Sequence, residues 1–202
     1  LVVLCEYKLG LLIRETLLQL IGEMEMLKMP IWKRCVIIFF QPMALVIDIL
    51  NSNPYIITIK GKIRGFWCYT KHITSLDVSG CPALTSLRCY GNNLTSLEVS
   101  KNTALTKLSC GNNSLTSLDV SKNTALTSLD CGNNSLTSLD ISKNTALTYL
   151  RCGNNNLSAS ALNKIFNDLP INDGNIYFND NPGTDTCDKR ILDYKRWECN
   201  CR

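Results

Sequence analysis

The sequence predicts a mainly β solenoid built from short parallel strands, and three observations support this. Isoleucine or leucine recurs every 21 residues from Ile73 to Leu157, without an insertion. Cysteine recurs with the same spacing from Cys68 to Cys152. Each 21-residue unit also divides into two related halves, as in residues 126–135 and 136–146. A constant period of this length is typical of a stack of structural units, each of which contacts only its neighbours.

Each half is predicted to be a short strand followed by a turn. Leucine stands at the first and fourth positions of a half, and cysteine, valine or isoleucine stands at the sixth. Since alternate side chains of a strand face the same way, the fourth and sixth positions point into the core. Parallel stacking follows, because only neighbouring units can pair with the backbone of such short strands.

The repeats define the domain boundaries. Residues 55–63 alternate in polarity and are rich in β-branched side chains, which predicts a strand that covers the open end of the stack. The solenoid is therefore assigned to residues 55–157. Residues 158–202 are predicted to form a C-terminal capping unit. In it, Ser158 or Ser160 caps a helix that ends before Pro170, and a strand and a last helix follow.

Residues 1–54 share nothing with the repeat and are treated as a separate N-terminal segment. Residues 7–29 have helical composition but carry several charges, which disfavours a membrane span. Residues 35–47 are uncharged, short for a span and suited to the apolar core of a signal peptide. One hypothesis is that residues 29–50 are an export signal with translation starting at Met24, Met26 or Met29. The alternative is an apolar segment packed on the first repeat, or an upstream translation artefact.

The halves resemble the leucine-rich repeat, and the doubled pattern with Leu-Asp in its second half is similar to the bacterial IRREKO-type subclass. The resemblance covers roughly residues 63–157. The tail, with the segment NPGTD at 181–185 and Trp197, resembles the closing unit of Bacteroidetes surface leucine-rich-repeat proteins. Two features depart from that family: the first 62 residues, and the ending after Trp197, where the family carries a further strand.

This resemblance implies an exported or surface-attached bacterial protein that binds host or neighbour proteins or glycans without catalysis. The formal charge of +4 is spread along the chain, so no basic domain suggests nucleic acid. We expect no membrane anchoring by this chain, and a monomer. The alternative function is a structural spacer, or a fragment of a larger surface protein with no ligand of its own.

The repeated columns are interpreted as structural. Two asparagine columns are expected to bond backbone groups that the turns leave unpaired. The five-cysteine column is expected to pack as an apolar ladder and to hold no metal, because the thiols lie in a line, ~4.8 Å apart, and do not converge. A row of carboxylates is expected to lie on the outer face beside lysines, with divalent-cation binding as the alternative. It is formed by Asp77, Glu98, Asp119 and Asp140.

Function is expected where the units differ, because packing imposes sameness only on inward positions. The outward positions of the first-half strands carry aromatic and charged residues of the types that dominate binding hot spots. The candidate binding face consists of Trp67, Tyr69, Arg88, Tyr90, Lys107, Asp130, Tyr149 and Arg151. For Trp67 and Tyr69 the alternative is packing under the N-terminal segment.

No catalytic constellation is recognisable in the sequence. His72 is the single histidine, and no serine or cysteine motif stands near a partner base. We therefore predict no enzyme activity, no cofactor and no metal site. A repeat array attached to a catalytic domain outside this chain is the third alternative.

Overall fold

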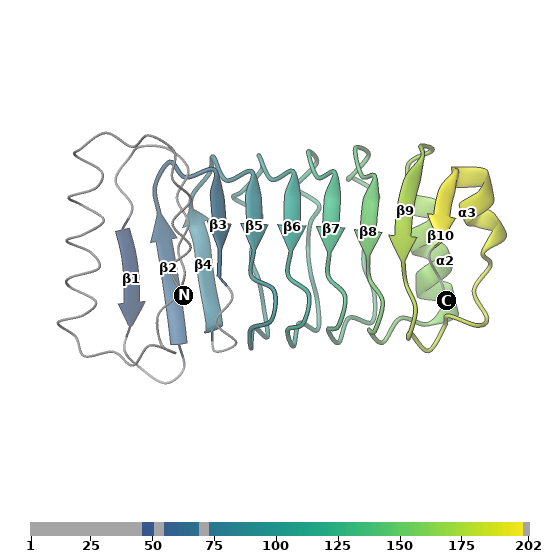
Figure 1. The fold of residues 1–202 in the computed structure, drawn as a ribbon, viewed down its shortest axis with the longest axis horizontal. Helices are drawn as coiled ribbons and strands as arrows, with labels where there is room; N and C mark the ends of the chain where they lie inside the picture. Colours follow the sequence, from purple (N-terminus) through teal and green to yellow (C-terminus); the bar gives the residue numbers. More distant parts are fainter. Residues whose placement is uncertain (1–45, 51–54, 69–72, 200–202) are drawn as a thin grey trace, which may run out of the picture.

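The computed structural model describes residues 46–50, 55–68 and 73–199, and it contains an elongated stack with two sheets (Figure 1). The expectations for residues 1–45, including most of the export-signal region, lie outside the described residues. The larger sheet has seven strands in the order β10-β9-β8-β7-β6-β5-β3, and the smaller has the order β1-β2-β4. The fold is thus the predicted solenoid of short parallel strands.

Five strands of the larger sheet are formed by the first halves of the repeats, and a sixth strand, β9, follows the last repeat. They pair in parallel, with one leucine, isoleucine or phenylalanine of each strand aligned on the next. In the five repeat strands this is the middle residue, and it is buried while its two neighbours face outward. These strands are β3 (Gly65–Trp67), β5 (Ser86–Arg88), β6 (Lys107–Ser109), β7 (Ser128–Asp130), β8 (Tyr149–Arg151) and β9 (Gly174–Tyr177).

The smaller sheet covers one end of the stack on its second-half side. Strand β2 (Tyr55–Lys60) pairs in parallel with β4 (Ile73–Gly80), the second half of the first unit. The predicted covering strand is therefore present. Strand β1 (Val46–Leu50) adds to β2 in antiparallel orientation, which extends regular structure into the segment assigned to residues 1–54.

The prediction of a strand in every half is wrong for the later second halves. Beyond β4, the described part of this side contains only an isolated bridge between Asp77 and Glu98. The carbonyl groups here have other donors. Val99 O, for example, accepts from Asn102 N at 2.9 Å and from the side-chain amide of Asn123 at 3.0 Å. Because such turns use the backbone acceptors, no ladder forms between units.

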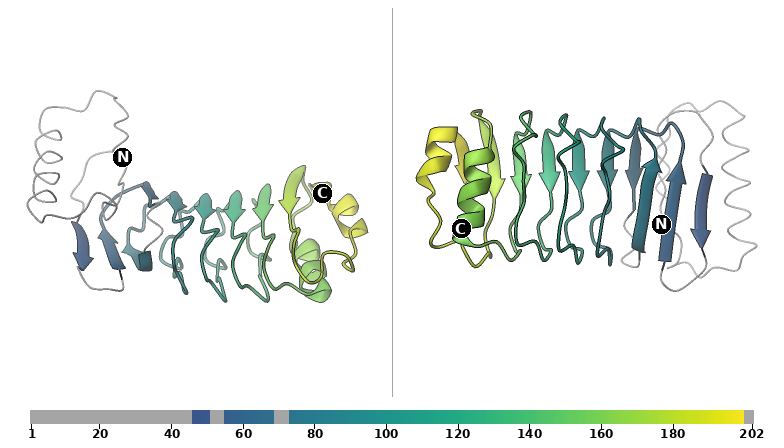
Figure 2. Two further views of the ribbon diagram at one scale, coloured as in Figure 1. Left: turned by 60° about the horizontal axis from the view of Figure 1, so that its bottom comes forward. Right: turned by 180° about the vertical axis from the view of Figure 1, so that it is seen from behind.

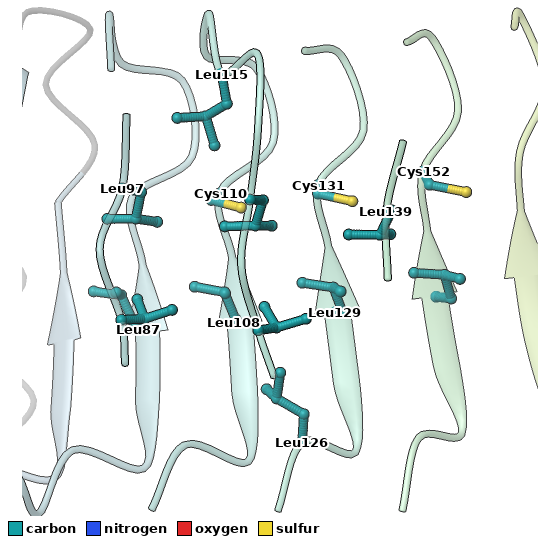
Figure 3. Packing of buried hydrophobic residues seen from close by; sticks show 14 of the residues in the cluster. Leu87, Leu97, Leu108, Cys110, Leu115, Leu126, Leu129, Cys131, Leu139 and Cys152 are labelled. Atoms are coloured by element: carbon teal, nitrogen blue, oxygen red, sulfur yellow. The ribbon is translucent and has the colours of Figure 1, made fainter. Parts of the chain in front are cut away.

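The core runs unbroken along the stack between these two sides. It contains the aligned leucines of both halves and the cysteine column, all of them buried (Figure 3). Seen edge-on, the strands of the larger sheet form one long side of the array, and the turns of the second halves and the capping helix form the other (Figure 2).

The capping unit closes the opposite end of the core. Helix α2 (Ala159–Asp168) begins at Ser158, whose hydroxyl accepts from Ala161 N, so the first of the two predicted caps is used. Its buried face packs on the last repeat. Helix α3 (Arg190–Lys195) and strand β10 (Trp197–Cys199) complete the unit.

The expected lack of a further strand at this end is wrong, because β10 begins at Trp197 and runs to Cys199. It pairs in parallel with β9. Trp197 is buried and its indole N–H donates to Pro170 O at 2.8 Å, which fixes the strand against the end of α2. Cys199 is disulfide-bonded, whereas free thiols are found at Cys81, Cys89, Cys110, Cys131, Cys152 and Cys187.

Candidate binding face

The outward residues of β3 and β5 to β8 gather most of the predicted site residues on one side of the sheet. Parallel pairing in register places the first outward residue of each strand in one row and the second in another. Tyr90 extends this side just after β5. Tyr69 lies outside the described residues. We call this surface the varied face; its described members are Trp67, Arg88, Tyr90, Lys107, Asp130, Tyr149 and Arg151.

A depression of about 270 Å³ lies in the middle of the varied face. It brings together five of the predicted residues, with the buried Leu108 at its floor. Ser109 and Ser128 also line it, although sequence reasoning did not select them because serine recurs so often in the repeat. The lining residues are Arg88, Tyr90, Lys107, Leu108, Ser109, Ser128, Asp130 and Tyr149.

Arg88 and Tyr90 are held at one end of the depression by neighbours on adjacent units. The Arg88 guanidinium lies over the ring of Trp67, 5.4 Å from the ring centroid, a cation–π contact. The Tyr90 hydroxyl accepts a hydrogen bond from the side-chain amide of Asn112. Both side chains are thereby positioned by the stacking of the units.

Asp130 and Arg151 form a pair on neighbouring strands. Their charged atoms lie 3.9 Å apart, and the Asp130 side chain is only 19% exposed. Asp130 Oδ1 also accepts from Gly132 N at 3.1 Å. Burial raises the pKa of Asp130, and the Gly132 hydrogen bond and the Arg151 charge only partly offset this. Of the two carboxylate oxygens, Oδ1 is therefore engaged by Gly132 N, and Oδ2 faces the Arg151 guanidinium.

Tyr149 meets Tyr177 of the capping unit, a contact that sequence reasoning missed. The ring centroids are 5.6 Å apart, with the planes tilted by 44°. Tyr177 is the β9 residue in register with Arg151, so the face continues into the cap. The alternation of Ile176 and Phe178 around it was the available signal. Burial, followed by the Asp130 charge, raises the pKa of Tyr149.

Glycines that follow the cysteine column give these side chains their room. A Cβ on Gly111 would lie 2.9 Å from Gly132 O and 3.0 Å from the Asp130 carboxylate. A Cβ on Gly132 would lie 3.3 Å from two atoms of the Arg151 side chain. Asp130 and Arg151 thus lean toward the preceding unit, over its glycine, whereas Tyr90 reaches Gly111 and Asn112 of the following unit.

The cysteine column lies beneath this face and is fully buried. Desolvation raises the pKa of Cys89 and of Cys152 to about 12, and also raises the pKa of Cys110 and Cys131. The thiols of Cys89, Cys110, Cys131 and Cys152 are free. No cluster of three or more potential metal ligands occurs among the described residues.

The outer carboxylates mainly bond their own turns. Asp119 Oδ1 accepts from Ser121 N at 2.8 Å, and Asp77, Glu98 and Asp140 make the same contact with a serine two residues on. These serine contacts lower the pKa of all four groups, with the nearby lysines as smaller contributors. The row therefore consists of separate turn contacts.

The first asparagine column bonds the backbone as predicted. Asn113 donates to Cys89 O and Cys110 O, both at 3.0 Å, and its carbonyl accepts from Leu94 N. Asn181 of the cap continues this column, because it donates to Cys152 O and accepts from Leu157 N.

The second asparagine column uses only one end of each amide. Asn123 donates to Val99 O and Asn102 O, whereas the carbonyl oxygens of Asn102, Asn123 and Asn144 are buried and have no protein partner among the described residues. Cys81 takes the first position of this column, and its thiol contacts Ile59 O at 3.3 Å.

Comparisons with known proteins agree with this architecture. Residues 103–144 match the family model described as Leucine Rich repeats (2 copies). The array has the fold of a leucine-rich-repeat solenoid. The matched family is not a catalytic one. A search of curated proteins found no match.

Solved bacterial structures share the leucine-rich-repeat fold. A functional domain of InlJ from Listeria monocytogenes, described as including a cysteine ladder, is 36% identical over 60% of this chain, with a TM-score of 0.51. Internalin InlF of the same species has 24% identity over 65% of the chain and a TM-score of 0.57. Internalin C2 has 21% identity over 66% and a TM-score of 0.50. The chain spans 27%, 38% and 63% of these three structures, respectively.

No helix in the described ranges is long and apolar enough to cross a membrane.

Proposed function

We propose that this leucine-rich-repeat chain is a non-enzymatic recognition module that binds a protein or a glycan through its varied face. The proposal depends on one observation: the units differ in sequence mainly at the outward positions of their first halves. Their second halves repeat serine, aspartate and lysine almost unchanged, whereas the outward first-half positions differ from unit to unit and surround one depression. Packing does not require that variety, and ligand recognition does.

The residue types on the face suit recognition. Tyrosine, tryptophan and arginine dominate binding hot spots. On this face Trp67 orients Arg88, Asn112 orients Tyr90, and Asp130 orients Arg151. A surface whose side chains are held before the ligand arrives loses less conformational entropy on binding.

The extent of the face limits the ligand to a small contact. Five strands at ~4.8 Å span about 25 Å, which suits a loop, a peptide or a glycan better than a standard protein interface. In line with the resemblance, we place this module on the surface of, or outside, a bacterium of the Bacteroidetes type, in a protein with IRREKO-type repeats.

The second candidate is a structural spacer in a longer protein. It is favoured by one observation: the chain spans only 27% of the InlJ domain that it resembles. In a spacer the varied face would have no ligand.

Binding of wild type and two variants to glycan arrays and to intact cells separates the two candidates. The face variant carries alanine at Arg88, Tyr90, Tyr149 and Arg151. The control variant carries alanine at Lys101, Lys122 and Lys143, which are exposed on the second-half side. We expect the face variant alone to lose binding. Equal binding by all three proteins would favour the spacer.

A further inference from the structure

Two positively charged side chains at the depression have no acidic partner among the described residues. Arg88 and Lys107 are exposed, and neither has an acidic partner within the part of the chain that the structure describes. A cation–π contact with Trp67 orients Arg88 but leaves its charge uncompensated. Two adjacent strands thus present two uncompensated positive charges to one 270 Å³ depression.

The neutral groups add further donors. The hydroxyls of Ser109, Ser128 and Tyr149 have no hydrogen-bond partner among the described residues. The Tyr90 hydroxyl accepts from Asn112, so its own hydrogen remains available. The one carboxylate, Asp130, is mostly covered and already engaged by Gly132 N and Arg151. The depression therefore combines two uncompensated positive charges with free hydroxyls that can each donate or accept a hydrogen bond.

An extended peptide matches this surface poorly. Strands β5 to β8 are paired on both sides, so they offer no free edge to which a peptide strand could add. Recognition must therefore occur through side chains.

A sugar that carries an acidic group matches the surface better. Its anionic group complements Arg88 and Lys107, because hydrogen bonds to charged partners are the strongest available. Its hydroxyls both donate and accept, so they can pair with Ser109 and Ser128. Tyr90 and Tyr149 line the same depression and offer amphipathic rings for the carbon skeleton of the sugar.

Resting on the proposed function, we propose that the varied face binds an acidic saccharide, whose carboxylate or sulfate lies between Arg88 and Lys107. Neutral parts of the sugar contact the serine and tyrosine hydroxyls. Trp67 holds Arg88 in place for this contact.

Isothermal titration calorimetry with four defined probes tests the inference. They are trigalacturonic acid, its trimethyl ester, a sulfated galactose trisaccharide and a hexaglutamate peptide. We expect one of the two acidic sugars to bind at least about tenfold more tightly than the ester. Carboxylated and sulfated sugars are thereby distinguished, and either result supports the class.

Two charge-matched variants locate the contact. The double variant Arg88→Gln and Lys107→Gln should weaken acidic-sugar binding by about tenfold or more, whereas Lys101→Gln with Lys122→Gln should change it less than about twofold. Both variants lose two positive charges. Circular dichroism and the Tm of each variant verify folding.

Three results would overturn the inference. They are binding of the ester as tight as that of the tighter-binding acidic sugar, binding of hexaglutamate tighter than that of both acidic sugars, and no binding of either acidic sugar to wild type. Equal losses in the two double variants would also overturn the placement between Arg88 and Lys107. If the sugars fail while the alanine face variant still loses binding to cells, the ligand class is wrong and the proposed function stands.

Discussion

The pentapeptide LTSLD occurs at 115–119, 126–130 and 136–140, and the first two copies have different structures. The second copy contains strand β7, paired on both sides, whereas the first is not a strand. Asp119 is exposed, and its turn with Ser121 lowers its pKa. Asp130 is partly buried beside Arg151, and burial raises its pKa.

This comparison teaches that the neighbouring units, and not the local sequence, decide the role of a residue. Both aspartates accept from the amide two residues on. They differ in what stands beside them: small serine turns on one side of the stack, and a charged, aromatic face on the other. The same unit thereby provides a uniform side and a varied side, and we propose the varied side for recognition.

The largest expected loss of stability comes from the asparagine columns, and its size differs between the two columns. Asn155 bonds at both ends of its amide, to Cys131 O, Cys152 O and Leu136 N, whereas Asn144 bonds only Val120 O and Asn123 O. Asn155→Ala should lower the free energy of unfolding by about 3 kcal/mol and Asn144→Ala by about 2 kcal/mol. Urea unfolding measures both, and a larger loss for Asn144→Ala would contradict the difference between the columns.

A smaller loss of stability is expected at a position that both halves share. It lies two residues after the last outward-facing residue of the half. On the varied side this is Gly111, where a Cβ would press on Gly132 O and on Asp130; on the uniform side it is Ser100. Gly111→Ala should cost about 1–2 kcal/mol, and Ser100→Ala less than about 0.5 kcal/mol. Equal Tm values for the two variants would show that the face has more room than the structure indicates.

The cysteine column should be inert. With pKa values of about 12 for Cys89 and Cys152, roughly one thiol in ten thousand is ionised at pH 8. Native protein should therefore react with a thiol reagent at the half-buried Cys187 long before it reacts at the column.

Removing one thiol of the column tests its packing role. Cys131→Ala should cost about 1 kcal/mol in urea unfolding, the cost of a small cavity. Elemental analysis should find no zinc in either protein. Stoichiometric zinc in wild type, lost on this substitution, would contradict a packing role.

The smallest effect is a difference in pH dependence between the two aspartates. The folded-state pKa of Asp119 is lowered, so its contribution is present above its ordinary value of 3.8 and is lost as pH falls through the folded value. The folded-state pKa of Asp130 is raised, so stability decreases as pH rises from 3.8 through the folded value. Asp119→Asn and Asp130→Asn should therefore change the slope of Tm against pH in opposite directions. Slopes that change in the same direction would mean that the two environments are alike.

The period was enough to predict the stack, its inward leucines and cysteines, and the first asparagine column. It could not show that the later second halves lack strands, because both halves share one apolar pattern and differ in how their carbonyls are used. Strand β10 was missed for a similar reason, since it depends on Trp197 reaching Pro170 O across the cap.

The varied face was predicted as a set of residues, but its depression was not. That Asp130 is engaged while Arg88 and Lys107 are uncompensated depends on side-chain directions that alternation does not specify. The contribution of Tyr177 depends on the register of β9, which the 21-residue period does not reach.

The most direct test of the central claim is backbone amide NMR of the intact chain during titration with the acidic trisaccharide that binds. We predict that the largest chemical-shift changes fall at residues 86–90, 107–109, 128–130 and 149–151. Changes concentrated at the second-half turns, such as residues 98–101 and 119–122, or in the capping unit, would contradict the assignment of recognition to the varied face.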